Sequence, residues 1–182
     1  MIVTVLHGSP RKGKNSDTLV DYFLSGLNYL EEHNINHFYL NELEISPCQG
    51  CLSCAEYPHS CRIIDDMQSI YESYKTSNII VWASPMYWGY ITAQLKLVQD
   101  RMEALAWSGF EDKIFVVILT YRHHYQSTAS MFQRIAPHFN IDLHILECCT
   151  YDKETKKDVP VSEINDKIKE AYQLGLKIGN KK

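Results

Sequence analysis

The chain has 182 residues, which suits one α/β domain, because a single hydrophobic core serves chains of up to roughly 250 residues. A formal net charge of −4 gives no general attraction for nucleic acid, and no apolar run approaches the roughly 18 residues that span a bilayer. The first residues are strand-like and show neither the basic start nor the long apolar stretch that is typical of a signal peptide. We therefore expect a cytoplasmic protein that binds neither nucleic acid nor membrane.

The first half of the chain alternates strand-like and helix-like segments. The apolar run 2–6 predicts a strand, followed by a polar loop to residue 15 and a helix that Ser16 or Asp17 could cap. A second strand is expected near 37–40. After an aperiodic segment at 46–62, Asp65 could cap another helix. The apolar run 79–83 predicts a buried strand, and the spacing at 92–105 predicts a helix.

The second half continues the same alternation. We expect a strand at 114–119, a helix near 127–139, a strand near 143–148 and a last helix from about Ser162. Five strands that alternate with helices imply parallel strands, right-handed crossovers and helices on both faces of the sheet. The pattern predicts an α/β fold in which residues 1–182 form a single domain with a cysteine-rich loop at 46–62.

The loop after the first strand is suited to binding phosphate. It runs from Gly8 to Ser16, between a strand and a helix, where free backbone N–H groups and the helix dipole favour an anion. A phosphate monoester fits such a site, and a solvated basic turn is the plain alternative. The loop nearly matches the nucleotide-binding P-loop, but Asn15 stands where that motif needs a Ser or Thr hydroxyl for Mg²⁺.

Four of the six cysteines lie close together in the sequence. Cys48, Cys51 and Cys54 follow one another at three-residue steps, and Cys61 closes the set. Such a run lets a tightly turning backbone aim three thiolates at one cubane, and a fourth cysteine completes a [4Fe–4S] site. Zinc, or thiols that are free or form a redox pair, remain as alternatives.

Three separated motifs agree in order and in predicted position. They are Gly8-Ser9-Pro10-Arg11 through Asn15-Ser16, then Ser84-Pro85-Met86-Tyr87-Trp88-Gly89, then Gln94-Leu95-Lys96 with Asp100-Arg101. Together they resemble the NADPH-dependent FMN reductase family over roughly residues 1–105. The four cysteines, followed by Asp65-Asp66-Met67, resemble the iron–sulfur flavoprotein branch of that group.

The resemblance implies a flavodoxin-like three-layer sandwich with strand order 2-1-3-4-5 and FMN at the switch point between strands one and three. Carried over position by position, the residues that would hold the FMN phosphate are Ser9, Arg11, Asn15, Ser16 and Thr18. Those that would flank the isoalloxazine ring are Pro85, Met86, Tyr87, Trp88 and Gly89. The aromatic residues among them could instead be core or subunit-contact side chains.

The same resemblance implies an enzyme in which NAD(P)H reduces FMN, which passes electrons to a small acceptor, either a quinone or a flavin. No catalytic side chain is required or named. If the cysteines hold a cluster, the molecule would be an electron carrier that exchanges electrons with a ferredoxin-like protein. A zinc-binding module without catalysis is the third alternative. Because flavins in this family sit near subunit contacts, we expect a homodimer or homotetramer.

One loop departs from the family pattern. The third flavin-contacting loop of the family follows the fourth strand and is usually glycine-rich, whereas here it is Thr120-Tyr121-Arg122-His123-His124. A direct role for His123 and His124, in metal binding or proton transfer, is left open.

Overall fold

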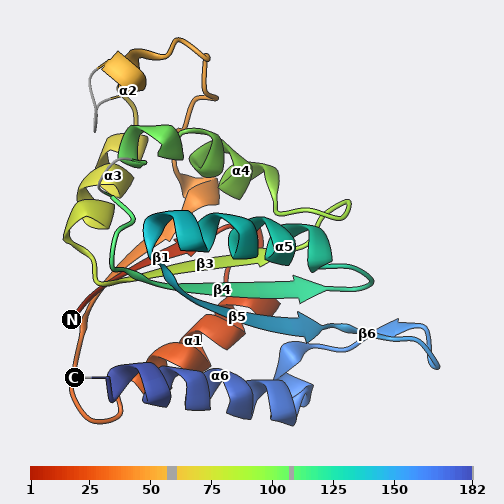
Figure 1. Cartoon of the computed structure of the whole chain (residues 1–182). Helices are drawn as coiled ribbons and strands as arrows, with labels where there is room; N and C mark the ends of the chain where they lie inside the picture. The colour runs from red at the N-terminus through yellow and green to blue at the C-terminus, as the bar shows by residue number, and fades with distance from the viewer. Residues whose placement is uncertain (57–60, 107–108, 182) are drawn as a thin grey trace.

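The computed structural model describes residues 1–56, 61–106 and 109–181. Its centre is a parallel sheet of five strands: β1 (Ile2–His7), β2 (Asn34–Tyr39), β3 (Ile79–Pro85), β4 (Ile114–Tyr121) and β5 (Asp142–Cys149). Their order across the sheet is β2-β1-β3-β4-β5 (Figure 1). The expected flavodoxin-like α/β fold and its strand order are confirmed. Register between β1 and its neighbours places His7 beside Tyr39 on β2 and Ala83 on β3.

Helices cover both faces of the sheet (Figure 1). One face carries α1 (Asn15–Leu27) and α6 (Asn165–Gly179), and the other carries α3 (Met67–Thr76), α4 (Ala93–Asp100) and α5 (Gln126–Ile135). Alternate residues of β1 serve the two cores, since Val3 and Val5 face α1 while Leu6 faces α3 and α4. No helix in the described ranges is long and apolar enough to cross a bilayer.

Shorter elements join these layers. A four-residue helix α2 (Ser53–Glu56) lies in the cysteine segment. The described residues include four 3₁₀ turns, namely η1 (Leu40–Glu42), η2 (Met102–Leu105), η3 (Ala136–Phe139) and η4 (Val161–Glu163). A small antiparallel hairpin of β6 (Tyr151–Asp152) and β7 (Lys157–Asp158) follows β5. It was not expected from the sequence.

Helices α1 and α6 touch backbone to backbone. A Cβ added to Gly175 would lie 1.9 Å from the carbonyl oxygen of Phe23, and one added to Gly26 would lie 2.0 Å from that of Tyr172. Only glycine lets two helices approach this closely. The contact fixes α1, and with it the loop that precedes α1.

Several expected helix boundaries are corrected. Helix α1 begins at Asn15, so Ser16 and Asp17 lie within its first turn and do not cap it. The helix expected over 92–105 is interrupted, because α4 ends at Asp100 and η2 begins at Met102. The last helix begins at Asn165, after the 3₁₀ turn that contains Ser162. In contrast, Asp65 does accept a hydrogen bond from the Met67 N–H at the start of α3, at 3.1 Å.

Candidate functional site

A pocket of about 640 Å³ opens at the carboxyl ends of β1, β3, β4 and β5. This is the edge at which parallel α/β sheets bind ligands, on either side of the point where strand order reverses. The pocket is lined by residues from four segments that are far apart in the sequence, namely Arg11, Asn15, Pro85, Met86, Tyr87, Trp88, Thr120, Tyr121, Arg122, Thr150, Asp158, Val159 and Pro160.

The loop between β1 and α1, residues 8–14, forms one end of the pocket and is called the phosphate loop below. Its entry is fixed because the Gly8 N–H donates to the Ala83 carbonyl at 2.8 Å and Thr92 Oγ1 donates to the Gly8 carbonyl at 2.6 Å. The N-cap residue of α1, Lys14, makes no side-chain capping hydrogen bond. The N-terminus of α1, beside Arg11 and Asn15, is therefore suited to an anion.

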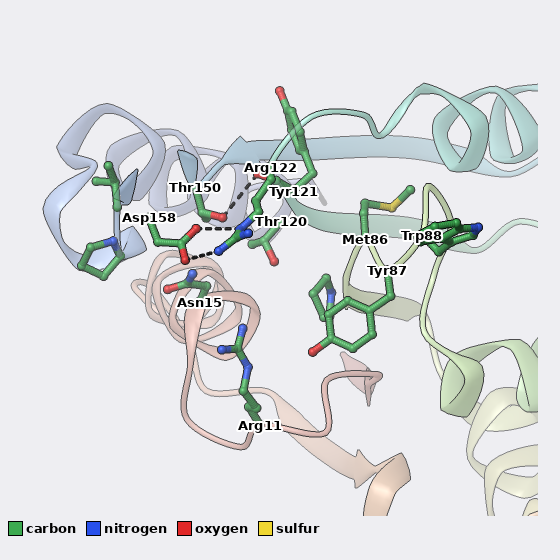
Figure 2. Close-up of a pocket in the computed structure, with 13 residues that line it drawn as sticks. Arg11, Asn15, Met86, Tyr87, Trp88, Thr120, Tyr121, Arg122, Thr150 and Asp158 are labelled. Carbon is green, nitrogen blue, oxygen red and sulfur yellow. Dashed lines mark hydrogen bonds and ion pairs between the residues drawn. The ribbon is translucent and has the colours of Figure 1, made fainter. Parts of the chain in front are cut away.

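The loop after β3 forms the apolar end of the pocket. Tyr87 and Tyr90 pair through two backbone hydrogen bonds, 2.8 and 3.1 Å long, around a tight turn. Trp88 and Gly89 occupy this turn with φ of +52° and +81°. A positive φ at tryptophan is strained, and the Trp88 side chain is fully exposed. In Figure 2 the Tyr87 ring faces the phosphate loop across the pocket, with Met86 behind it.

The third wall comes from β4 and from the hairpin after β5. Arg122 makes a two-pronged ion pair with Asp158, with Nε to Oδ1 at 2.7 Å. Figure 2 shows this pair beside Asn15 and Thr150, opposite Tyr87. Tyr121 donates its hydroxyl to Glu147 at 2.6 Å, and burial together with that carboxylate raises the pKa of Tyr121. Its hydroxyl points away from the pocket (Figure 2).

Six of the ten expected FMN-contacting residues line this pocket: Arg11, Asn15, Pro85, Met86, Tyr87 and Trp88. The other four, Ser9, Ser16, Thr18 and Gly89, are not among its lining residues. Ser9 Oγ accepts from the Arg11 N–H at 3.1 Å. Ser16 is buried against Thr120 at 3.2 Å, and Thr18 bonds to the Lys14 carbonyl.

Sequence reasoning missed the wall formed by Thr150, Asp158, Val159 and Pro160. The available signal was topological. In a parallel sheet every strand ends at the same edge, so the segment after the fifth strand belongs to the pocket as much as the others do. His123 and His124 are not among the described residues that line the pocket.

The four clustered cysteines face a second, smaller cavity. It has a volume of about 30 Å³ and is lined by Cys48, Cys51, Cys54 and Cys61 together with Arg101 and its neighbours. In Figure 1 the described part of this segment up to residue 56, with α2, projects above α4. Hydrogen bonds from Ser53 lower the pKa of the exposed Cys51 thiol, and burial raises that of Cys54.

Arg101 ties the base of the cysteine segment to the core. Its buried guanidinium donates to the Ile63 carbonyl at 2.9 Å and pairs with Asp65, and it contacts Cys61 Sγ at 3.5 Å. Asp65 in turn accepts from the Ser46 N–H at 2.8 Å. The two ends of the segment therefore meet at one buried ion pair.

The cysteine side chains do not converge at metal-binding distances. Within the ranges that the structure describes, no three Cys, His, Asp or Glu side chains are grouped closely enough to hold a metal ion. The donor chemistry nevertheless suits iron, because four thiols face one cavity and a guanidinium there can offset thiolate charge. A cluster at these cysteines stays a prediction, and it would require the four side chains to move closer to one common point.

Comparison with known proteins decides the family. Residues 1–141 match the family described as NADPH-dependent FMN reductase. The chain belongs to this family. The resemblance expected from the three motifs is thus confirmed.

Relatives within the FMN reductase group carry the name of the expected branch. An iron-sulfur flavoprotein from Methanosarcina thermophila is 36% identical over 110 residues, 60% of this chain and 56% of that protein. One from Clostridioides difficile is 29% identical over 133 residues, 72% of this chain and 59% of that protein. The chain thus spans little more than half the length of these relatives.

Solved structures share the fold at low identity. An FMN-dependent NADH-azoreductase from Bacillus anthracis, in complex with FMN, superposes with a TM-score of 0.72 at 13% identity, covering 99% of this chain and all of that one. An NAD(P)H:quinone oxidoreductase from Methanothermobacter marburgensis gives 0.68 at 14% identity, over 100% and 98% of the two chains. At such identities these likenesses concern the fold.

Proposed function

We propose that this member of the FMN reductase family binds FMN in the 640 Å³ pocket and passes electrons from NAD(P)H to a small acceptor, a quinone or a flavin. The observation that carries the proposal is the polarity of this pocket. Arg11 and Asn15 lie at one end, beside the uncapped start of α1, and Met86, Tyr87 and Trp88 lie at the other. FMN has the same polarity, with a phosphate at one end and a flat ring at the other.

The chain's own residues would bind and orient the cofactor. Backbone N–H groups at the start of α1, with Arg11 and Asn15, would hold the phosphate, as would Ser9, Ser16 and Thr18 after small rotations of their hydroxyls. Pro85, Met86, Tyr87 and Gly89 would form the wall against the ring. When bound, FMN supplies hydride acceptance and electron release in single or paired steps.

Arg122 and Asp158 would close the pocket on the side of the hairpin. The Arg122 hydrogen bond lowers the pKa of Asp158, so this carboxylate stays charged and paired beside an anion site. Arg122 neutralises the negative charge of Asp158, which would otherwise repel a phosphate ester at the phosphate loop.

A second function is favoured by the cavity that all four clustered cysteines line. In this alternative, Cys48, Cys51, Cys54 and Cys61 hold a [4Fe–4S] cluster, and the molecule is an electron carrier between FMN and a ferredoxin-like protein. The relatives named iron-sulfur flavoproteins support it. We also propose that residues 1–182 form one cytoplasmic domain, with a cysteine-rich loop at 46–62, that assembles as a homodimer or homotetramer.

An absorbance spectrum of protein purified without oxygen tests both functions, with iron and acid-labile sulfide assayed on the same sample. Flavin bands with about four irons per chain support the iron–sulfur alternative. Flavin without iron, with NAD(P)H oxidised in the presence of a quinone, supports the reductase. A colourless protein that does not bind added FMN would contradict both.

A further inference from the structure

Three side chains form a hydrogen-bonded chain beneath the phosphate loop. Asp17 Oδ1 lies 2.8 Å from His7 Nδ1, and His7 Nε2 lies 3.0 Å from His37 Nδ1. The His7 side chain is 1% exposed and that of Asp17 is 5% exposed. Neither residue lines the pocket, and the proposed function assigns no role to them.

Strand alternation explains how a histidine reaches this position. His7 continues the row of Val3 and Val5 on the face of β1 that α1 covers, one step beyond the apolar core. Its ring stacks on that of Tyr39, its neighbour on β2, with centroids 4.2 Å apart. His37 lies two residues before Tyr39, on the same face, and is exposed. The hydrogen bonds therefore lead from the buried Asp17 carboxylate through His7 to the exposed His37.

These hydrogen-bonded side chains also hold the shape of the phosphate loop. Asp17 Oδ2 accepts the Gly13 N–H at 2.6 Å, and Gly13 adopts a φ of +69°. Lys12 lies over the Tyr39 ring, 3.7 Å from its centroid, and pairs with Glu42 at 2.9 Å. Asp17 thus fixes Gly13, and Tyr39, on which His7 stacks, fixes Lys12.

Two proton arrangements fit these distances. His7 Nδ1 must carry hydrogen to donate to a carboxylate, so Nε2 of a neutral His7 accepts from His37 Nδ1–H. If one proton is added from solvent at His37, the bond between the rings can reverse, and His7 becomes a cation beside Asp17. Burial, together with the nearby His7, lowers the pKa of His37, which favours the neutral arrangement in the protein without ligand.

We propose that Asp17, His7 and His37 are positioning residues for the phosphate loop, and that the two histidines take up a proton when a phosphate monoester binds there. The inference rests on the proposed FMN site. A phosphate brings negative charge to the helical turn that contains Asp17, and a proton on His7 offsets the repulsion between the two anions.

The charges around His7 and His37 favour the uptake of a proton rather than its release. From α1, Asp17 and Asp21 both favour a cation at His37, and Asp17 also hydrogen-bonds to His7; from β2, Tyr39 is neutral and His37 supplies the route to solvent. From the loop, the charge of Lys12 opposes a cation, but Glu42 on η1 is paired with it. The neighbour on β3, Ala83, carries no charge.

Isothermal titration calorimetry of the full chain, stripped of flavin, tests the proposal. Binding enthalpies measured between pH 7 and 8 in buffers of different ionisation enthalpy give the number of protons taken up. FMN should be bound with uptake of up to one proton, and its affinity should fall by at most about tenfold per pH unit above neutrality. Riboflavin, which lacks the phosphate, should show neither effect.

Substitutions identify the groups that take up the proton. In His7→Asn the amide can still donate to Asp17 but cannot titrate, so FMN should bind with uptake near zero. In His37→Asn, at an exposed position, proton uptake on FMN binding should also be near zero. This variant tests the proposal if His7→Asn does not fold. His138→Asn, at an exposed histidine on η3, is the matched control and should retain the wild-type uptake.

Three outcomes would overturn the inference. The first is unchanged proton uptake in a folded His7→Asn or His37→Asn variant. The second is FMN binding by the wild-type protein without uptake, which leaves the proposed function intact. The third is no FMN binding by the wild-type protein, which overturns the proposed function as well.

Discussion

Among single residues, Arg101 has the clearest structural role outside the pocket. Replacing it by alanine leaves the Asp65 carboxylate without its cation, at a site where the Asp65 side chain is only 10% exposed. Removing one partner of a buried pair costs about 3–5 kcal/mol. We expect Arg101→Ala to lower the free energy of unfolding by this order, measured by urea denaturation, and to lower any iron content.

Lys96 provides the matched control for Arg101. It lies on α4, which ends one residue before Arg101, and pairs with Asp100, but both side chains are almost half exposed. An exposed pair of this kind contributes at most about 1 kcal/mol. If Lys96→Ala and Arg101→Ala destabilise the protein equally, the buried ion pair does not hold the base of the cysteine segment.

The stability contribution of Asp65 should depend on pH. Burial acts to raise its pKa, but the Ser46 N–H and Arg101 outweigh burial and lower it. Because the folded pKa lies below the unfolded one, Asp65 stabilises the fold above the ordinary carboxyl pKa of about 4, and less as pH falls through the folded value. Urea unfolding of wild type and Asp65→Asn should therefore differ most near neutral pH and less toward acid. A constant difference would contradict this assignment.

At the scale of elements, the contact between α1 and α6 is the most sensitive to substitution. Gly175→Ala would place a Cβ 1.9 Å from the Phe23 carbonyl, so the helices must separate. Overpacking typically costs about 1–3 kcal/mol. We expect a loss in this range by urea denaturation and weaker FMN binding, because α1 carries the phosphate loop. Lys169→Ala, at an exposed position of α6, should change neither, and an unchanged Gly175→Ala protein would contradict the expectation.

The elements that could be predicted were those with a strong apolar pattern. The runs that became β1, β3 and β4 are almost wholly buried, so composition alone marks them as strands. The β6–β7 hairpin has two residues in each strand and is half-buried or exposed, so no periodicity existed to detect. The capping role expected of Asp17 was wrong because this carboxylate instead contacts His7 and Gly13, in a strand and a turn that no local pattern relates to it.

At the scale of the whole molecule, the sequence predicted the two loops that flank the switch point but not the full pocket. Arg11 and Tyr87 belong to motifs with recognisable spacing. Asp158 reaches the pocket only because the hairpin folds back beside α1, an arrangement fixed by tertiary contacts such as the Val161 N–H to Asn15 at 3.2 Å. The cysteine set was recognisable, but its grouping around Arg101 depends on the break between α4 and η2.

In the sequence, α4 lies between the turn at residues 87–90, called the aromatic turn, which contributes to the pocket, and Arg101, which contributes to the cysteine cavity. The aromatic turn precedes this helix and Arg101 follows it, and eight residues of helix span about 12 Å. The aromatic turn nevertheless reaches back along the helix, because Gln99, near the end of α4, donates from Nε2 to the Tyr90 hydroxyl at 3.5 Å. In the homo-oligomer that we propose, a second copy would cover the aromatic turn, where Trp88 is fully exposed.

Trp88 is the residue through which such assembly can be tested. Its large apolar side chain is fully exposed in a turn with positive φ, where contact with a second copy would remove it from water. Asparagine tolerates a positive φ, so Trp88→Asn keeps the turn and removes only the ring. Sedimentation velocity should show an oligomer for wild type and a shift toward monomer for Trp88→Asn, with Tyr29→Asn, at another exposed aromatic residue, unchanged. A wild-type protein that is monomeric at every concentration would contradict the expected homo-oligomer, and an equally oligomeric variant would place the contact elsewhere.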